Sequence, residues 1–520
     1  MWDSLLAASD VQSIIFFKGV VVLAIGMLVW NTIEVGRNDA TNLVNAVYGA
    51  RILNLRTAAL VAGVGVILGA ATSSRVIGTA RTGIFDPTEL DMNQALAAYI
   101  SVYIVNTVLL YGYSAFGMPV STTACLVFEL LGVSIALGGF GIVHWQTAFK
   151  VILAIVISIF LTAIIGFMVQ RAVRGAIGDR GRNLATLLLH GGWAGGGMLA
   201  GLCYFLIVKG MQDLTFVEAL HQSVLEKYGI GMIIMTLWAL FAILIHATLV
   251  IFREKAAYWL LPVLAVVGMI SMGFAFGQND LANCAAPGLA IWNLFRFENV
   301  AKATEVDISV WLLWVCGLLL VIGMNTKSAL RVTRAAVSAG SMSHNVALYA
   351  PRWCLRLARL MMRFRGKEPT LAPPPMRSAT GQRMHYDALR ACVILGVSAC
   401  VIALASNMAL PVSTTYVAFA AVMATGAADR IMQRGDADLK IARTIWVVFS
   451  WFISVIIAAM AAAAVCWTIH HLAFLGIILS MSVNIVIRHF LKKKADSLDA
   501  RTQEAAHERI YPERYAEYEG

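Results

Sequence analysis

Long apolar segments separated by short polar ones make up most of the chain. A helix of about 20 apolar residues crosses the hydrocarbon core of a bilayer, so stretches of this length predict membrane spans. Two shorter stretches, near 120–138 and 412–428, each begin at a proline and have room for a span or a re-entrant hairpin. About eleven full-length stretches run approximately over residues 16–35, 57–80, 95–116, 146–169, 186–208, 229–252, 258–276, 309–330, 388–407, 443–467 and 470–488.

Composition supports the same fold class. Hydrophobic residues make up 59% of the 520 positions and charged residues only 13%, whereas a soluble domain has about 25% charged residues. We therefore expect an all-α integral membrane protein with about 11–12 transmembrane helices, embedded in the lipid bilayer of a cell membrane as a multi-pass protein. The N-terminus lacks a basic region, so the segment from Phe16 onward is expected to be a first span and not a cleaved signal.

The net charge of +11 is concentrated in one place. Between Lys327 and Arg390 there are twelve Lys or Arg residues and two acids, and a second cluster, Lys492 to Lys494, follows the last apolar segment. Basic residues beside spans indicate the cytoplasmic side, so this loop and the C-terminus are expected in the cytoplasm. No nucleic-acid-binding motif is visible, and the eight cysteines lie singly without zinc-ligand spacing. We expect no nucleic-acid partner and no cofactor.

Two motif pairs show that the chain is duplicated. GRNDATN at 36–42 matches GQNDLAN at 277–283, and PVSTT occurs at both 119–123 and 411–415. The order is the same in both halves, and the distance between motif positions is 83 residues in the first half and 134 in the second. The extra 51 residues are close to the length of the basic segment 331–387, which suggests an insertion into an otherwise equivalent repeat.

The predicted organisation follows from this duplication. Residues 1–330 form a membrane domain with the first repeat (about 16–170), connecting spans and the start of the second repeat (from about 258). Residues 331–387 form a basic cytoplasmic insertion with an amphipathic piece, RWCLRLARLMMRF. Residues 388–490 complete the second repeat, and residues 491–520 form a polar C-terminal tail.

The NDxxN motifs point to a cation site. Two Asn residues at i and i+4 share a face of a helix, and the glycine before each motif offers a place where the helix can break. A carboxylate at membrane depth costs about 2.5–3.5 kcal/mol, and neutral amide and hydroxyl oxygens around it suit a small hard cation that offsets this cost. Helix capping is the alternative interpretation, which the duplication disfavours. The candidate cation-site residues are Asn38, Asp39, Asn279 and Asp280.

The PVSTT motifs point to an anion site. A proline in the first turn followed by hydroxyl side chains predicts a helix N-terminus. Exposed N–H groups and the positive end of the helix dipole attract an anion, and two such ends can meet at one midplane site. The alternative is an ordinary span whose hydroxyls bond to its own carbonyls. The candidate anion-binding residues are Ser121, Thr122, Thr123, Ser413, Thr414 and Thr415, together with Asn42 and Asn283.

Two polar residues occur in the first half only. Arg37 has Gln278 at its equivalent position, and it could give an anion a bidentate contact or extend to a membrane interface. Glu129 has Ala421 at its equivalent position. An acid within a membrane segment suggests a proton or cation site, although a lone protonated or hydrogen-bonded side chain explains it as well. Glu34 is a similar candidate, closer to a possible interface.

The paired GxNDxxN and PxSTT motifs resemble those of the inorganic phosphate transporter family, and the resemblance covers about residues 30 to 470. It implies two inverted repeats, re-entrant hairpins that start at the STT motifs, frequent homodimers, and uptake of inorganic phosphate driven by Na⁺ or H⁺. The twelve Asn, Asp, Ser and Thr residues named above match the motifs of the family position by position. Arg37 departs from them, because family members usually have a small residue there.

The expected function is a symporter that moves inorganic phosphate with a coupling cation, Na⁺ in preference to H⁺, by alternating access. The expected location is a bacterial inner membrane or an equivalent plasma membrane. A permease of the same fold for sulfate or another oxyanion is the nearest alternative. An uncoupled channel is a further one, as is an intramembrane hydrolase with Ser121 or Ser413 as nucleophile. No His lies near either serine in sequence, so we expect that the protein is not an enzyme.

Overall fold

The computed structural model describes residues 2–85, 89–211, 226–297, 309–339, 341, 350–364, 384–430 and 437–510. In these ranges the chain is helical, and its one β contact is an isolated antiparallel bridge between Phe85 and Val143. The all-α prediction is therefore confirmed. In order, the elements are α1 (Trp2–Gly49), α2 (Leu55–Ala70), α3 (Ser74–Thr82), α4 (Met92–Ala115), α5 (Thr122–Gly138), the 3-10 helix η2 (Gly139–Ile142), α6 (Trp145–Ile177), α7 (Leu184–Leu202), the π-helix η3 (Cys203–Lys209), α9 (Glu226–Phe297), α11 (Val310–Met324), α12 (Lys327–Ala339), α13 (Arg352–Phe364), α14 (Ala388–Asn407), α15 (Thr414–Ala428) and α16 (Ala437–Ile510).

The predicted apolar stretches all lie in helices or in bent helix pairs, and the two short ones are α5 and α15. Among the described residues, eight helices are long and apolar enough to cross a membrane, or ten if each of two bent pairs counts as one span. Both α9 and α16 contain two of the predicted stretches. Their helical paths are interrupted at Arg253 (φ 47°) and Ala473 (φ 46°). A multi-pass helical membrane protein is thus confirmed.

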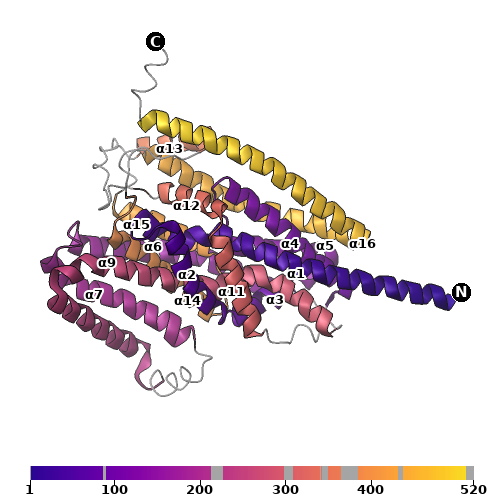
Figure 1. Ribbon diagram of the computed structural model, residues 1–520, viewed down its shortest axis with the longest axis horizontal. Coiled ribbons are helices and arrows are strands. Elements are labelled where there is room, and N and C mark those ends of the chain that lie inside the picture. Colours follow the sequence, from indigo (N-terminus) through magenta and orange to yellow (C-terminus); the bar gives the residue numbers. More distant parts are fainter. Residues whose placement is uncertain are drawn as a thin grey trace, which may run out of the picture.

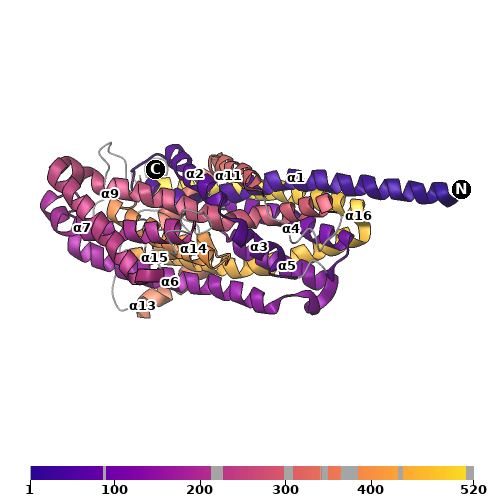
Figure 2. The ribbon, with the colours of Figure 1, turned by 90° about the horizontal axis from the view of Figure 1, so that it is seen from below.

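The two halves of the chain are interlocked. In the first half α5 packs on α16 of the second half, and in the second half α15 packs on α6 of the first. The helices with the NDxxN motifs follow the same rule, because α1 packs on α11 and the C-terminal part of α9 packs on α2. Figures 1 and 2 show α16, from the yellow end of the colour scale, beside α4 and α5 from the purple end. Each half therefore packs partly against the other half.

The motif glycines permit two of these contacts. A Cβ on Gly36 would overlap the carbonyl oxygen of Leu320 in α11, and a Cβ on Gly277 would overlap that of Val66 in α2. The sequence-based expectation that the helices break at these glycines is wrong, because α1 and α9 continue through both motifs. The absent side chain lets two helix backbones approach closely, as small residues do in membrane helix pairs.

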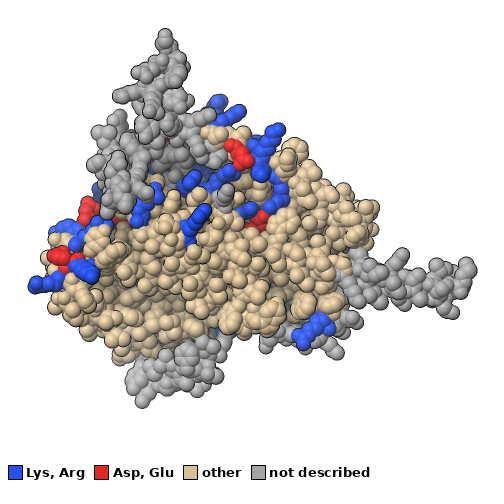
Figure 3. Space-filling view, in the orientation of Figure 1, with Lys and Arg blue, Asp and Glu red and all other residues tan. Residues whose placement is uncertain are grey.

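Charged residues are unevenly distributed over the surface. In Figure 3, Lys and Arg gather along one edge of the molecule, and the broad face beside that edge is mostly uncharged. The basic segment contains α12 and α13, and α13 covers the piece predicted to be amphipathic. Residues 340, 342–349 and 365–383 of the predicted insertion, and 511–520 of the predicted tail, lie outside the described residues. The part of the tail before them continues α16 to Ile510.

Candidate functional site

Both STT motifs begin helices, as predicted. The Ser121 hydroxyl accepts a hydrogen bond from the Ala124 N–H (2.9 Å) at the start of α5, and the Ser413 hydroxyl accepts one from the Tyr416 N–H (3.1 Å) at the start of α15. The prolines do not lie in the first turn as expected. Each precedes its capping serine by two residues and lies before the helix. The serines therefore fix where both helices begin.

The carboxylate of Asp39 lies at the centre of one hydrogen-bonded cluster in the C-terminal part of α1. Its Oδ1 accepts from Asn38 Nδ2 (2.9 Å) and Asn42 Nδ2 (3.1 Å) on the same helix. Thr122 of α5 donates to Oδ2 (3.2 Å), and Thr415 of α15 donates to Oδ1 (2.9 Å). Both the first and the second half of the chain thus supply donors to this carboxylate.

The carboxylate of Asp280 lies at the centre of a matching cluster in α9. Its Oδ1 accepts from Asn283 Nδ2 (2.6 Å) and from Thr123 of α5 (3.1 Å). The Thr414 hydroxyl of α15 donates to Oδ2. Asn283 Nδ2 also donates to the hydroxyls of Thr122 (3.0 Å) and Thr123 (2.8 Å), so this asparagine joins the cluster to α5.

The two clusters show a crossed pattern. Each aspartate binds the first threonine of the STT motif in its own half and the second threonine of the motif in the other half. The starts of α5 and α15 also contact each other, because Thr123 donates to the Val412 carbonyl (2.9 Å) and Thr415 to that of Val120 (3.3 Å). The four motifs therefore form one continuous site.

The first asparagine of each motif holds the turn before the STT helix. Asn38 donates to the Val120 carbonyl (2.9 Å), and Asn279 donates to that of Leu410 (3.1 Å). Two serines that the sequence analysis missed complete these contacts: Ser114 donates to Asn38 Oδ1 (3.2 Å), and Asn279 donates to Ser406 (3.0 Å). A signal for them exists, because a serine stands five residues before the proline in each half.

The site contains two buried carboxyl groups and neutral donors. Asp39, Asp280 and all the Asn and Thr residues of the four motifs are buried. In the described part of the chain no Lys or Arg forms an ion pair with either aspartate. Amide and hydroxyl donors stabilise a carboxylate but leave its charge uncompensated. The arrangement is chemically suited to attract a cation.

Arg37 points toward a different group of residues. It pairs with Glu34 one turn earlier on α1 and lies over the ring of Tyr111 at 5.0 Å. Arg488 of α16 pairs with the same carboxylate at 2.7 Å and lies over the same ring at 4.1 Å. Two guanidinium groups share one carboxylate here, and among the described residues neither is hydrogen-bonded to an STT hydroxyl. Anion binding by Arg37 stays a prediction.

Glu129 lies two turns into α5 and is fully buried. Neither of its carboxylate oxygens has a hydrogen-bond partner among the described residues. Ala421, at the equivalent position of α15, is buried too. The structure thus confirms the burial expected of this acid and leaves its role as a prediction.

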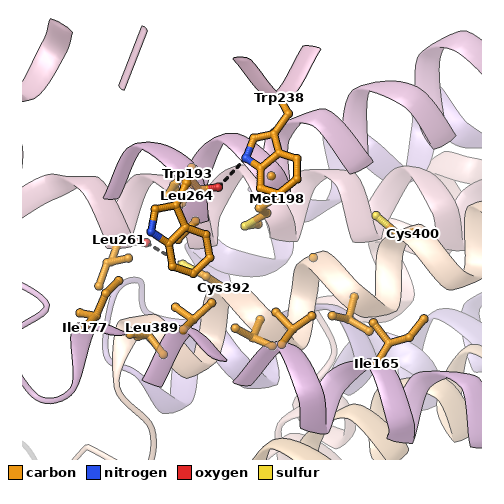
Figure 4. A pocket seen from close by; sticks show the side chains of 18 of the residues that line it. Ile165, Ile177, Trp193, Met198, Trp238, Leu261, Leu264, Leu389, Cys392 and Cys400 are labelled. Atoms are coloured by element: carbon orange, nitrogen blue, oxygen red, sulfur yellow. Dashed lines mark hydrogen bonds between the residues drawn. The ribbon is translucent and has the colours of Figure 1, made fainter. Parts of the chain in front are cut away.

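A separate apolar cavity of about 320 Å³ lies between α6, α7, α9 and α14. Figure 4 shows Ile165, Met198, Trp238 and Leu389 around it, with Trp238 Nε1 donating to the Trp193 carbonyl at 2.8 Å. No residue of the four motifs lines this cavity. Within the described residues, no group of three or more His, Cys, Asp or Glu side chains could hold a metal ion. The polar clusters are therefore the candidate site.

Known proteins match this chain over the residues that contain the four motifs. The model of the phosphate transporter family matches residues 35–335 and 376–462, which include all four motifs. A Pyrococcus horikoshii protein named "Putative phosphate permease" is 26% identical over 462 residues, covering 85% of this chain and 95% of the relative. A Chlamydia muridarum protein of the same name is 25% identical over 448 residues, covering 82% and 92%.

A solved structure described as "The sodium-dependent phosphate transporter" has the same fold. It superposes with a TM-score of 0.67 at 20% sequence identity, covering 88% of this chain and all of the other. At this identity the likeness concerns the fold alone. The family match covers most of the chain and both motif pairs, so this multi-pass membrane protein belongs to the phosphate transporter family and is a transporter, not an enzyme.

Proposed function

We propose that this protein carries inorganic phosphate across the membrane together with a cation, Na⁺ in preference to H⁺, by alternating access. The observation that supports this most strongly is the crossed pattern of hydrogen bonds. Two buried aspartates and two helix N-termini meet in one site to which both halves contribute. The site therefore offers negative groups for a cation and helix ends for an anion in adjoining positions.

The cation part of the proposal concerns the two aspartates. Asp39 and Asp280, with Asn38 and Asn279 beside them, would hold the coupling ion, because their carboxylates are buried with neutral donors only. Intact oxygen-rich clusters in both halves favour Na⁺, which prefers several neutral and anionic oxygens. Glu129 is the candidate for an additional proton or cation site, since its buried carboxyl has no hydrogen-bond partner among the described residues.

The anion part concerns the STT motifs. The hydroxyls of Ser121, Thr122, Thr123 and their equivalents Ser413, Thr414 and Thr415, with the amides of Asn42 and Asn283, would bind phosphate oxygens at the starts of α5 and α15. The threonine hydroxyls now donate to the aspartates. A cation on the aspartates would satisfy the carboxylates and release these hydroxyls for an anion, which links the two binding events. Arg37 would add a charged contact from one side.

Alternating access would act on the contacts between α5, α15 and the two NDxxN helices. These contacts cross between the halves, so a relative movement of the two halves changes both clusters together. We propose that the protein forms a homodimer in a bacterial inner membrane or an equivalent plasma membrane. We also propose that the basic segment 331–387 and the C-terminus lie on the cytoplasmic side.

Proteoliposomes with an imposed gradient test this proposal. We expect labelled phosphate to accumulate when Na⁺ is high outside, and to accumulate less when only a proton gradient is imposed. Excess unlabelled phosphate should compete and excess sulfate should not. Strong inhibition by sulfate would contradict phosphate as the specific substrate and favour a permease for sulfate or another oxyanion. Uptake that never exceeds equilibrium under either gradient would contradict symport.

A further inference from the structure

Helix α13 is separate from the candidate site and has an unusual distribution of side chains. At 100° per residue, its four arginines fall within about 60° of the helix circumference, and all four are exposed. They are Arg352, Arg356, Arg359 and Arg363. In Figure 1 the helix lies at the edge of the molecule next to α16.

A second face of α13 attaches the helix to the body. Cys354 and Ala358 are buried against Ala442 of α16, with Ile445 and Trp446 packed around them. The Trp353 ring meets the rings of Trp446 at 6.3 Å and Phe449 at 5.0 Å, both in edge-on geometry. Because this face packs on α16, it determines which other faces of α13 are exposed.

A third face is apolar and partly exposed. Trp353, Leu357 and Leu360 point to one side about 100° away from the arginine stripe, and they are 42%, 40% and 48% exposed. A helix with an apolar face of Trp and Leu beside a face of arginines has the composition of helices that lie in the membrane interface. The apolar side would enter the acyl region while the guanidinium groups stay at headgroup level.

We propose that α13 lies in the membrane surface and binds the headgroups of anionic phospholipids through its arginine stripe. Charge complementarity favours this occupant. Among the residues described, Asp438 is the acid paired with the stripe, at 3.4 Å from Arg359, and the two side chains are 36% and 66% exposed, respectively. Four guanidinium groups with one exposed carboxylate leave an excess of positive charge, and phosphate monoanions accept bidentate bonds from Arg.

The packing of α13 on α16 connects the proposed lipid-binding helix to the candidate site. The same part of α16 that receives α13 continues to both STT turns. Arg443 donates to the Gly117 carbonyl (2.8 Å), and Trp451 donates to the Pro119 carbonyl (3.3 Å) while stacking on Tyr416 at 3.9 Å. Lipid held by α13 would therefore fix the N-terminal end of α16 relative to the membrane surface.

Hydrogen–deuterium exchange of the full-length protein in nanodiscs tests the proposal. In phosphatidylcholine discs that contain phosphatidylglycerol, we expect the α13 amides to exchange at least about fivefold more slowly than in pure phosphatidylcholine. The difference should shrink as NaCl rises from about 0.05 M to about 0.5 M. The variant R352Q/R356Q/R359Q/R363Q should lose it. The variant K492Q/K493Q/K494Q, which removes an exposed basic cluster from α16, should keep it.

Equal exchange in the two lipids would overturn the proposal, as would protection that survives high salt or persists in the arginine variant. If the fourfold variant does not fold, the pair R352Q/R356Q and the salt series on the unmodified protein decide the question in the same way. Protection that appears with soluble polyphosphate and not with phosphatidylglycerol would assign the stripe to a soluble polyanion. None of these outcomes depends on phosphate transport.

Discussion

The two halves of the molecule share every residue of the crossed hydrogen-bond pattern and differ around it. The first half has Glu34, Arg37 and Glu129, where the second has Ala275, Gln278 and Ala421. It also has buried polar atoms without hydrogen-bond partners among the described residues, on Thr41, Asn45 and Glu129, and the positions equivalent to Thr41 and Asn45 are Ala282 and Ala286. The comparison teaches that shared positions define a common site and that the extra polar groups of the first half modify it.

Replacing an aspartate should have the largest effect. Asp39→Asn and Asp280→Asn keep the size of the side chain and remove its ability to carry a negative charge. We expect each to reduce cation-driven phosphate accumulation by up to about 100-fold, because hydrogen bonds to a charged group contribute about 1.5–3 kcal/mol. Proteoliposome uptake measures this. Asp179→Asn, at an exposed carboxylate, is the control. A large loss in one aspartate variant only would show that the two halves are not functionally equivalent.

The crossing threonines should rank next. Thr415→Val removes the donor that reaches Asp39 from the other half, and Thr123→Val removes the equivalent donor to Asp280. We expect about tenfold weaker Na⁺ dependence for each, measured as the Na⁺ concentration for half-maximal uptake. Thr468→Val, at an exposed hydroxyl bonded to its own helix, should change nothing. A double-mutant cycle between Asp39 and Thr415 that shows full additivity would argue against this contact.

Glu129 tests the asymmetry. Glu129→Gln keeps the shape and removes the ability to release a proton, so we expect Na⁺-driven uptake to fall by about fivefold or less and its dependence on pH to become flatter. Uptake between pH 5.5 and 8.5 measures this. The double variant E129A/A421E would move the acid to the other half. An unchanged pH profile in Glu129→Gln would argue against a role of Glu129 in proton binding and would favour a structural role.

The two serines before the turns should have the smallest effect. Ser114→Ala and Ser406→Ala each remove one neutral hydrogen bond to the asparagine that holds the turn. We expect about a threefold rise in the KM for phosphate, equal in both variants, with coupling to Na⁺ retained. A difference of more than tenfold between the two would show that the turns before α5 and α15 are not equivalent.

The positions of the membrane helices were predictable from the sequence, because long apolar runs are local signals. The twelve motif residues that meet around the two aspartates were also predictable, because a repeated pair of polar motifs is a local signal, whereas Ser114 and Ser406 were missed. The crossed pairing was not. Asp39 and Thr415 lie 376 positions apart, and no local pattern tells which threonine meets which aspartate. Continuity of α1 through Gly36 was missed because close packing on Leu320 outweighs the weak helix preference of glycine. The ion pair between Glu34 and Arg488 was also missed, because these residues lie 454 positions apart in the sequence.

The crossed pairing also constrains how the protein is made. Membrane proteins are inserted as they are synthesised, at about 5–20 residues per second. The 376 residues between Asp39 and Thr415 thus correspond to roughly 20–75 s of translation. During this interval the first carboxylate is in or near the membrane without its partner from the second half. During this time water, the insertion machinery or a proton on Asp39 must take the place of the Thr415 donor, and truncation before α15 would leave Asp39 with the donors of the first half only.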